Sequence, residues 1–209
     1  MCFLDECLNT PTSALVQLAD TFWRINEERW RYRLQESILK NVFERYSTNN
    51  LFNKVLIKVT LLNQYYSTHI TNVHKLAEHV FNIQDLDERI MSNAIDFDLV
   101  DEIGNVQLGK VPRFHYSFAT KYCSFHNPRV YPIYDKFAAQ ALAYYNTRGR
   151  LFGDFSYTSL IRERNYQEYC NFYRSFIDYF NLRNFSLKQI DRLLWQTGKI
   201  IHLRKGNAK

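Results

Sequence analysis

The chain has 209 residues, of which 46% are hydrophobic and 23% are charged. This length and composition suffice for the core of one large domain, and they exclude wholesale disorder. Only 6 Gly and 4 Pro are present, fewer turn residues than a β-sandwich or β-barrel usually needs. The net charge of +6 is compatible with a polyanionic partner, and equally with a role in solubility alone.

Cysteine usage and the apolar runs indicate the compartment. The four cysteines are scattered and form no C-x-x-C pair, which excludes a zinc ribbon or a thioredoxin-like site and favours reduced thiols. No apolar stretch approaches the roughly 20 residues of a membrane span, and the N-terminus lacks the features of a signal peptide. We therefore expect a cytoplasmic protein without a membrane partner, nucleoid-associated if it is bacterial.

The first half of the chain predicts helices. Apolar residues recur at steps of three and four from Leu15 to Ile25, behind an N-cap at Thr12 or Ser13. The run that starts at Leu51 is apolar on several faces, which predicts a buried helix. The expected helices cover residues 13–26, 30–46, 51–66, 73–81 and 85–94, and residues 96–109 form a connection or a short helix.

The second half continues in the same way. Asn127-Pro128 ends one helix, because the residue before a proline disfavours the helical conformation. In the last helix Ser186 is a good N-cap and Gly198 a good C-cap. The expected helices cover residues 114–126, 136–145, 166–180 and 186–198, with a surface loop over 148–159. The sequence thus predicts an all-α protein of about nine or ten helices.

Common catalytic motifs are absent from the sequence. It contains no Gly-rich phosphate loop, no G-x-S-x-G and no H-E-x-x-H. His69, His74 and His79 are five residues apart, which places each about 140° round a helix from the last, so they share no metal-binding face. We therefore predict no metal and no cofactor.

Two segments carry a family pattern. Residues 61–68 read Leu-Leu-Asn-Gln-Tyr-Tyr-Ser-Thr, and Val111 to Leu142 contains Val-Pro, Phe-Ala and then Tyr-Pro-Ile-Tyr-Asp, which ends at Asp135. They resemble the early helix, the hairpin and the aspartate-bearing turn of the helix-hairpin-helix DNA glycosylase superfamily. Residues 190–199 are similar to the last helix of its archaeal-type 8-oxoguanine branch.

The resemblance implies an architecture and a partner. It implies two helical lobes with a cleft between them, one formed by a contiguous insert of about residues 54–134 and the other by residues 1–53 plus 135–209. It further implies a monomer that binds double-stranded DNA, flips one base and hydrolyses its N-glycosidic bond.

The resemblance also assigns residues. Asp135 would be the catalytic carboxylate of a monofunctional glycosylase. Bifunctional members place a nucleophilic lysine where ungapped spacing puts Ser117, so Lys121, one turn later, is the alternative nucleophile. Residues expected around the flipped base are Asn63, Gln64, Tyr65, Tyr122, His126, Tyr134 and Trp195. Residues expected at the DNA backbone are Arg113, His115, Ser117 and Lys136.

The hairpin departs from the family pattern. Arg113 and His115 stand where glycines are expected. Those glycines let backbone N–H groups approach a phosphate closely, so side chains would have to bind the phosphate here.

Elementary chemistry gives Asp135 two compatible roles. Cleavage of an N-glycosidic bond passes through an oxocarbenium-like state, which a nearby carboxylate stabilises or helps water to attack. Aspartate is equally one of the commonest helix N-caps, and the helix dipole favours its negative charge.

Three functions remain open on the sequence alone. The first is a base-excision enzyme that acts on a damaged or modified base, in DNA repair or against modified phage DNA. The second is a non-catalytic nucleic-acid-binding module that kept the scaffold and lost the hairpin. The third is a helical protein–protein interaction domain.

Overall fold

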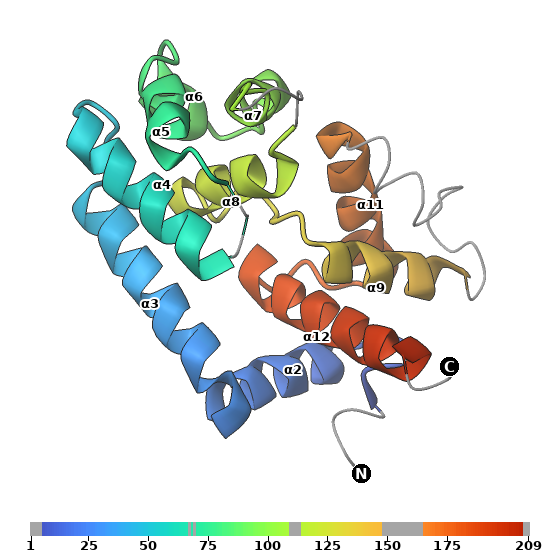
Figure 1. Ribbon diagram of the computed structural model, residues 1–209. Coiled ribbons are helices and arrows are strands. Elements are labelled where there is room, and N and C mark those ends of the chain that lie inside the picture. The colour runs from blue at the N-terminus through green and yellow to red at the C-terminus, as the bar shows by residue number, and fades with distance from the viewer. Residues whose placement is uncertain (1–5, 67, 69, 109–113, 148–164, 207–209) are drawn as a thin grey trace. The chain divides into compact units, whose positions relative to one another are not determined.

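The structure is a computed structural model that describes residues 6–66, 68, 70–108, 114–147 and 165–206. Every regular element in these ranges is a helix, which confirms the all-α prediction (Figure 1). The chain divides into two compact units. We call Trp30–Ile133 the inserted unit, and Met1–Arg29 together with Tyr134–Lys209 the discontinuous unit.

The inserted unit is built around helix α8. Its helices are α3 (Trp30–Arg45), α4 (Phe52–Tyr66), α5 (Val73–Phe81), α6 (Leu86–Ile90), α7 (Phe97–Gly104) and α8 (Tyr116–His126). Helix α8 packs against α3, α4 and α7 and is buried over most of its surface. Helix α3 buries only Leu39 and Phe43, and the Phe43 ring lies 5.6 Å from that of Tyr122.

The discontinuous unit is held by a close pair of helices. Its elements are α2 (Ser13–Ile25), the 3-10 turn η1 (Glu27–Arg29), α9 (Lys136–Thr147), α11 (Tyr166–Tyr179) and α12 (Leu187–Gly206). Helices α9 and α12 lie side by side, and α2 packs on α12 (Figure 1). The alanine-rich face of α9 is fully buried, which lets the two helices approach closely.

Gly198 corrects a sequence prediction. It does not end the last helix, since α12 continues to Gly206. A Cβ atom at position 198 would lie 1.9 Å from the Phe137 carbonyl oxygen, so glycine is required there because the backbone of α9 passes over it. Glycine often ends a helix, but Gly198 instead allows close contact between helices α9 and α12.

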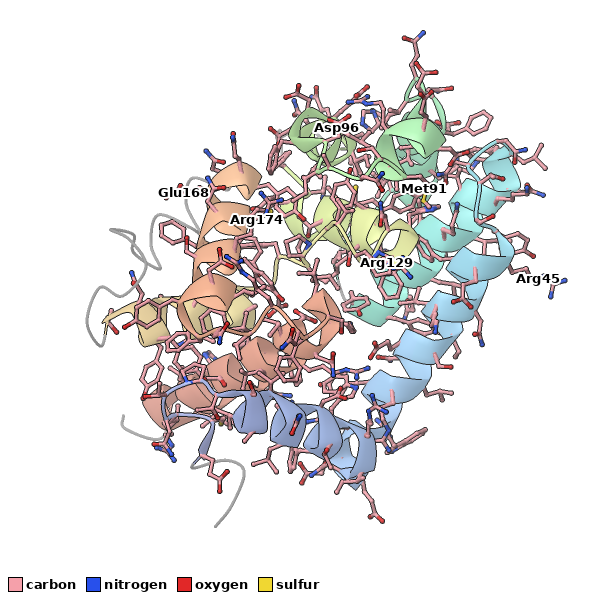
Figure 2. The ribbon with its side chains drawn as sticks, turned by 180° about the vertical axis from the view of Figure 1, so that it is seen from behind. Arg45, Met91, Asp96, Arg129, Glu168 and Arg174 are labelled. Carbon is pink, nitrogen blue, oxygen red and sulfur yellow. The ribbon has the colours of Figure 1, made fainter. Side chains whose placement is uncertain are left out.

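Other helix ends agree with the sequence. The Leu15 N–H donates to Thr12 Oγ1 at 3.1 Å, and the Gln189 N–H donates to Ser186 Oγ at 3.3 Å. Within residues 96–109 a helix does form, capped by Asp96, which Figure 2 labels and whose Oδ1 accepts from the Leu99 N–H at 2.8 Å. The expected loop over 148–159 lies outside the described residues.

The boundary between the units differs from the sequence expectation. The first division falls at Arg29 and Trp30, whereas the resemblance placed it near residue 54. The difference is helix α3, which packs on α4 and α8 and so belongs with them.

Candidate functional site

Asp135 lies at the N-terminus of α9, in the discontinuous unit. Its Oδ1 accepts a hydrogen bond from the Phe137 N–H at 2.8 Å, and its carbonyl accepts from the Ala139 N–H at 2.9 Å. The side chain therefore caps the helix, as expected. It is half-buried, and its Oδ2 has no hydrogen-bond or ion-pair partner among the described residues. One carboxylate oxygen is thus fixed while the other remains available.

Beside this cap the structure gathers aromatic rings and cations. The Phe137 ring lies edge-on to Trp195 at 6.1 Å and to His202 at 5.6 Å, measured between ring centroids. The Nζ of Lys199 lies 4.7 Å from the Trp195 ring centre. We call Phe137, Trp195, Lys199 and His202 the ridge.

The ridge joins three of the residues that the sequence singled out. Asp135 is hydrogen-bonded to the backbone of Phe137, and Lys136 Nζ lies 5.1 Å from the Phe137 ring centre. Trp195 completes the group through its contact with the same ring. The sequence analysis did not single out Phe137, Lys199 or His202, although the i, i+4, i+7 spacing of Trp195, Lys199 and His202 along α12 is visible in the sequence.

Tyr134 does not join this group. Its side chain is 8% exposed and its ring packs edge-on against Tyr169 of α11 at 5.2 Å. It is a core residue of the discontinuous unit.

In the inserted unit a buried lysine closes the end of α3. Lys58 Nζ donates to the carbonyls of Tyr46 at 3.0 Å and Thr48 at 3.1 Å, and to Asn49 Oδ1 at 2.6 Å. It also lies 3.2 Å from His126 Nε2, which must accept because an ammonium group only donates. These carbonyls follow the last turn of α3, where a helix leaves acceptors without partners.

Tyr122 and His126 belong to this interior network. The Tyr122 hydroxyl donates to Asn49 Oδ1 at 2.5 Å. Asn49 in turn donates from its backbone and side-chain nitrogens to the Asp87 carboxylate, at 2.7–3.0 Å. We call Asn49, Lys58, Asp87, Tyr122 and His126 the polar cluster. Buried polar groups need partners, and these two side chains find them inside the unit.

The electrostatics of the polar cluster follow from burial. Desolvation lowers the pKa of Lys58 to about 8, which Asp87 opposes and Lys54 reinforces. Desolvation also lowers the pKa of His126 to about 3, and the Lys58 charge lowers it further, against a hydrogen bond to the Ser47 backbone. His126 is therefore neutral at ordinary pH, as its acceptor role requires.

Lys121 and Ser117 are paired on α8. The Lys121 side chain is 2% exposed, its amine is hydrogen-bonded to Ser117 Oγ, and it lies 5.3 Å from the Tyr66 ring centre. Lys121, the alternative nucleophile, is thus hydrogen-bonded to Ser117, which stands where bifunctional family members have their lysine.

The remaining expected residues do not gather with these. Asn63 closes the turn after α4, since its side chain donates to the Ile70 carbonyl and accepts from the Ile70 N–H, each at 3.0 Å. Gln64 is exposed and Tyr65 half-buried at the end of the same helix. The His115 N–H, at the start of α8, donates to the Gly104 carbonyl at 2.8 Å. Arg113 lies outside the described residues.

In the parts of the chain that the structure describes, no group of three or more His, Cys, Asp or Glu side chains is arranged to hold a metal ion. None of the helices described here is long and apolar enough to cross a membrane.

Comparison with known proteins identifies the family. The HI_0787_N family model, which describes an N-terminal domain, matches residues 16–130. A Haemophilus influenzae protein described as "Uncharacterized protein" is 38% identical over 153 residues, which span 73% of this chain and 70% of that protein. No solved structure matches significantly. The family match ends before Asp135 and the ridge but covers more than half of the sequence, and the chain belongs to the HI_0787_N family.

Proposed function

We propose that this protein is a DNA glycosylase-like base-excision enzyme in which Asp135 is the catalytic carboxylate. The observation that carries the proposal is the hydrogen bonding of the Asp135 side chain. A backbone N–H holds one oxygen, the other has no partner among the described residues, and the ridge lies beside it.

Hydrolysis of an N-glycosidic bond requires a carboxylate that is held in place near the sugar. The bond between C1′ and the base nitrogen breaks, its electron pair leaves with the base, and positive charge develops on the sugar. Water adds its oxygen to C1′ and gives up one proton, and the departing base takes up one proton from solvent. A fixed carboxylate stabilises that charge and accepts the proton of the attacking water. Because the Phe137 N–H fixes Asp135, little reorganisation accompanies the reaction.

The ridge supports the same function. Trp195 offers a half-buried ring on which a flipped base or its sugar stacks, and Lys136 and Lys199 offer charges for phosphate. The chain order supports it too. A contiguous unit inserted into a discontinuous one is the order that the glycosylase resemblance implies.

A non-catalytic nucleic-acid-binding module is the second candidate. One observation favours it: the His115 N–H is already bound to the Gly104 carbonyl, so this hairpin amide is not available for a phosphate. A protein that has lost the hairpin contact could keep DNA binding and lose turnover.

An abasic-site assay tests both candidates. Duplex oligonucleotides that carry a panel of damaged and modified bases are incubated with wild type, Asp135→Asn and Asp178→Asn, then treated with alkali. Asparagine is as good an N-cap as aspartate, so Asp135→Asn removes the charge and keeps the helix end. Asp178 is an exposed acid of the same unit that pairs with Arg183, which makes it the matched control.

We expect wild type and Asp178→Asn to give alkali-dependent strand breaks and Asp135→Asn to give none. Breaks without alkali, trapped by borohydride and lost in Lys121→Gln, would replace this mechanism with the amine route. DNA binding without breaks on any base favours the binding module.

A further inference from the structure

The side chain of Arg29 has no carboxylate partner among the described residues. Arg29 ends η1, and its guanidinium carbon lies 5.4 Å from the centre of the Trp195 ring. Its Nε is buried and has no hydrogen-bond partner, and no carboxylate among the described residues pairs with its side chain. A buried N–H donor without a hydrogen bond costs free energy, so the burial of Arg29 Nε needs an explanation.

Neighbouring arginines of the same unit show the ordinary arrangement. Arg24 pairs with Asp20 at 2.8 Å, and Arg192 forms an ion pair with the same carboxylate while its guanidinium lies 5.7 Å from the Trp23 ring centre. The unit therefore repeats one motif, an arginine against a tryptophan. In one copy an internal carboxylate neutralises the arginine, and in the other no carboxylate of the described residues does so.

The surroundings of Arg29 are positively charged. Lys199 lies against the same Trp195 ring at 4.7 Å. Helix α9 contains no acid, and no acid follows Asp191 in the sequence. Glu27 and Glu28 share η1 with Arg29, but both are exposed and neither pairs with it. Two cations thus contact one aromatic ring, and no carboxylate among the described residues pairs with Arg29.

A phosphate fits this arrangement. The planar guanidinium offers donors in a fork that matches two phosphate oxygens, and the lysine adds a point charge. The aromatic ring that both cations contact suits the base or sugar that a phosphodiester carries. A carboxylate ligand would neutralise the charge of Arg29 and Lys199, but it would bring no base or sugar to stack on the Trp195 ring.

We propose that Arg29 and Lys199 bind a backbone phosphate of the DNA strand whose nucleotide reaches Asp135. The proposal rests on the function proposed above and adds two contacts that the sequence did not single out. Trp195 links the two sites, because its ring contacts Arg29, Lys199 and the Phe137 ring at the Asp135 cap.

The salt dependence of binding tests it. Fluorescence anisotropy measures the affinity of an undamaged duplex for wild type, Arg29→Gln, Lys199→Gln and the control Arg183→Gln, from 50 to 300 mM salt. Arg183 is an exposed arginine of the same unit, paired with Asp178. Each phosphate contact contributes about 0.9 to the slope of log K against log salt concentration. We expect each test variant to lose about one unit of slope and about 8-fold in affinity at 0.1 M salt.

Two further measurements identify the ligand and the cause. Arg29→Lys keeps the charge and loses the fork, so we expect it to keep the slope and bind more weakly. A thymidine monophosphate competitor and an RNA duplex distinguish the sources of phosphate. Equal competition by the mononucleotide, or tighter binding of the RNA, would overturn the proposal of a DNA strand. Thermal unfolding verifies that each variant is folded.

The outcomes separate this inference from the function on which it rests. Unchanged slopes in Arg29→Gln and Lys199→Gln, with base excision intact, would overturn the phosphate site and leave the glycosylase. Reduced slopes without excision on any base would support the phosphate site and count against the glycosylase.

Discussion

Replacement of Gly198 by alanine should loosen the contact between α9 and α12. A Cβ at that position would lie 1.9 Å from the Phe137 carbonyl oxygen, 2.5 Å from its carbon and 2.8 Å from its Cα. Ordinary contact begins near 3.4 Å, so the backbones must separate by about 1.5 Å. No rotamer change relieves this clash, because the obstructing atoms are backbone.

The size of the effect follows from two opposed terms. Overpacking costs about 1–3 kcal/mol, and a clash with backbone lies at the upper end of that range. Alanine in a helix interior recovers about 1 kcal/mol relative to glycine. We therefore expect a net loss of about 2 kcal/mol, which lowers Tm by about 4–8 °C in a chain of this length.

Thermal and urea unfolding of Gly198→Ala measure the loss, with Gly104→Ala as the control. At Gly104 the added Cβ meets the Phe114 ring at 2.6 Å, a side chain that can turn aside, so the loss there should be smaller. A Gly198→Ala protein as stable as wild type would refute the close-contact argument.

Three further predictions concern buried groups. The pKa of His126 is about 3 when folded and 6.5 for the free side chain, so the unfolded chain binds more protons between these values. The stability that depends on neutral His126 is then fully present above pH 6.5 and falls by about 1.4 kcal/mol per pH unit between pH 6.5 and 3, and urea titrations should show a shallower fall in His126→Gln. Asp20→Asn leaves two arginines without their carboxylate and should cost about 3 kcal/mol in urea unfolding, whereas Asp178→Asn should leave the midpoint unchanged. Burial raises the pKa of the Cys170 thiol to about 12, and the other described cysteines are also buried, so Cys2→Ser protein should react with a disulfide reagent at pH 8 only after denaturant is added.

Local signals made the helices predictable. The spacing of Leu15 to Ile25, the caps at Thr12 and Ser186 and the break at Asn127-Pro128 each depend on a few neighbouring residues, and the structure reproduces them. The predicted helix end at Gly198 was wrong, because the sequence alone does not distinguish a glycine that ends a helix from one that contacts a neighbouring helix.

The site was predictable only in part for a related reason. Asp135 is visible as a cap, but the ridge residues of α12 are 60 or more positions away from it in the sequence, and Arg29 is more than 100 away. Tyr122 and His126 are polar aromatics at helical spacing, a pattern that fits a pocket and a buried network equally. No residue near His126 in the sequence indicates that Lys58, 68 positions away, will be its hydrogen-bond partner.

The division of the chain into an inserted and a discontinuous unit sets an order of events during synthesis. The inserted unit is complete once residue 133 has left the ribosome, and domains generally fold as units as they emerge. Helix α2 is made earlier, yet the helix on which it packs, α12, is made last. Its apolar face, with Leu15, Val16 and Trp23, stays exposed while more than 150 further residues are translated. At about 5–20 residues per second that interval is on the order of 10–40 s, long enough for a chaperone that recognises nascent apolar helices to bind α2 before its own partner arrives.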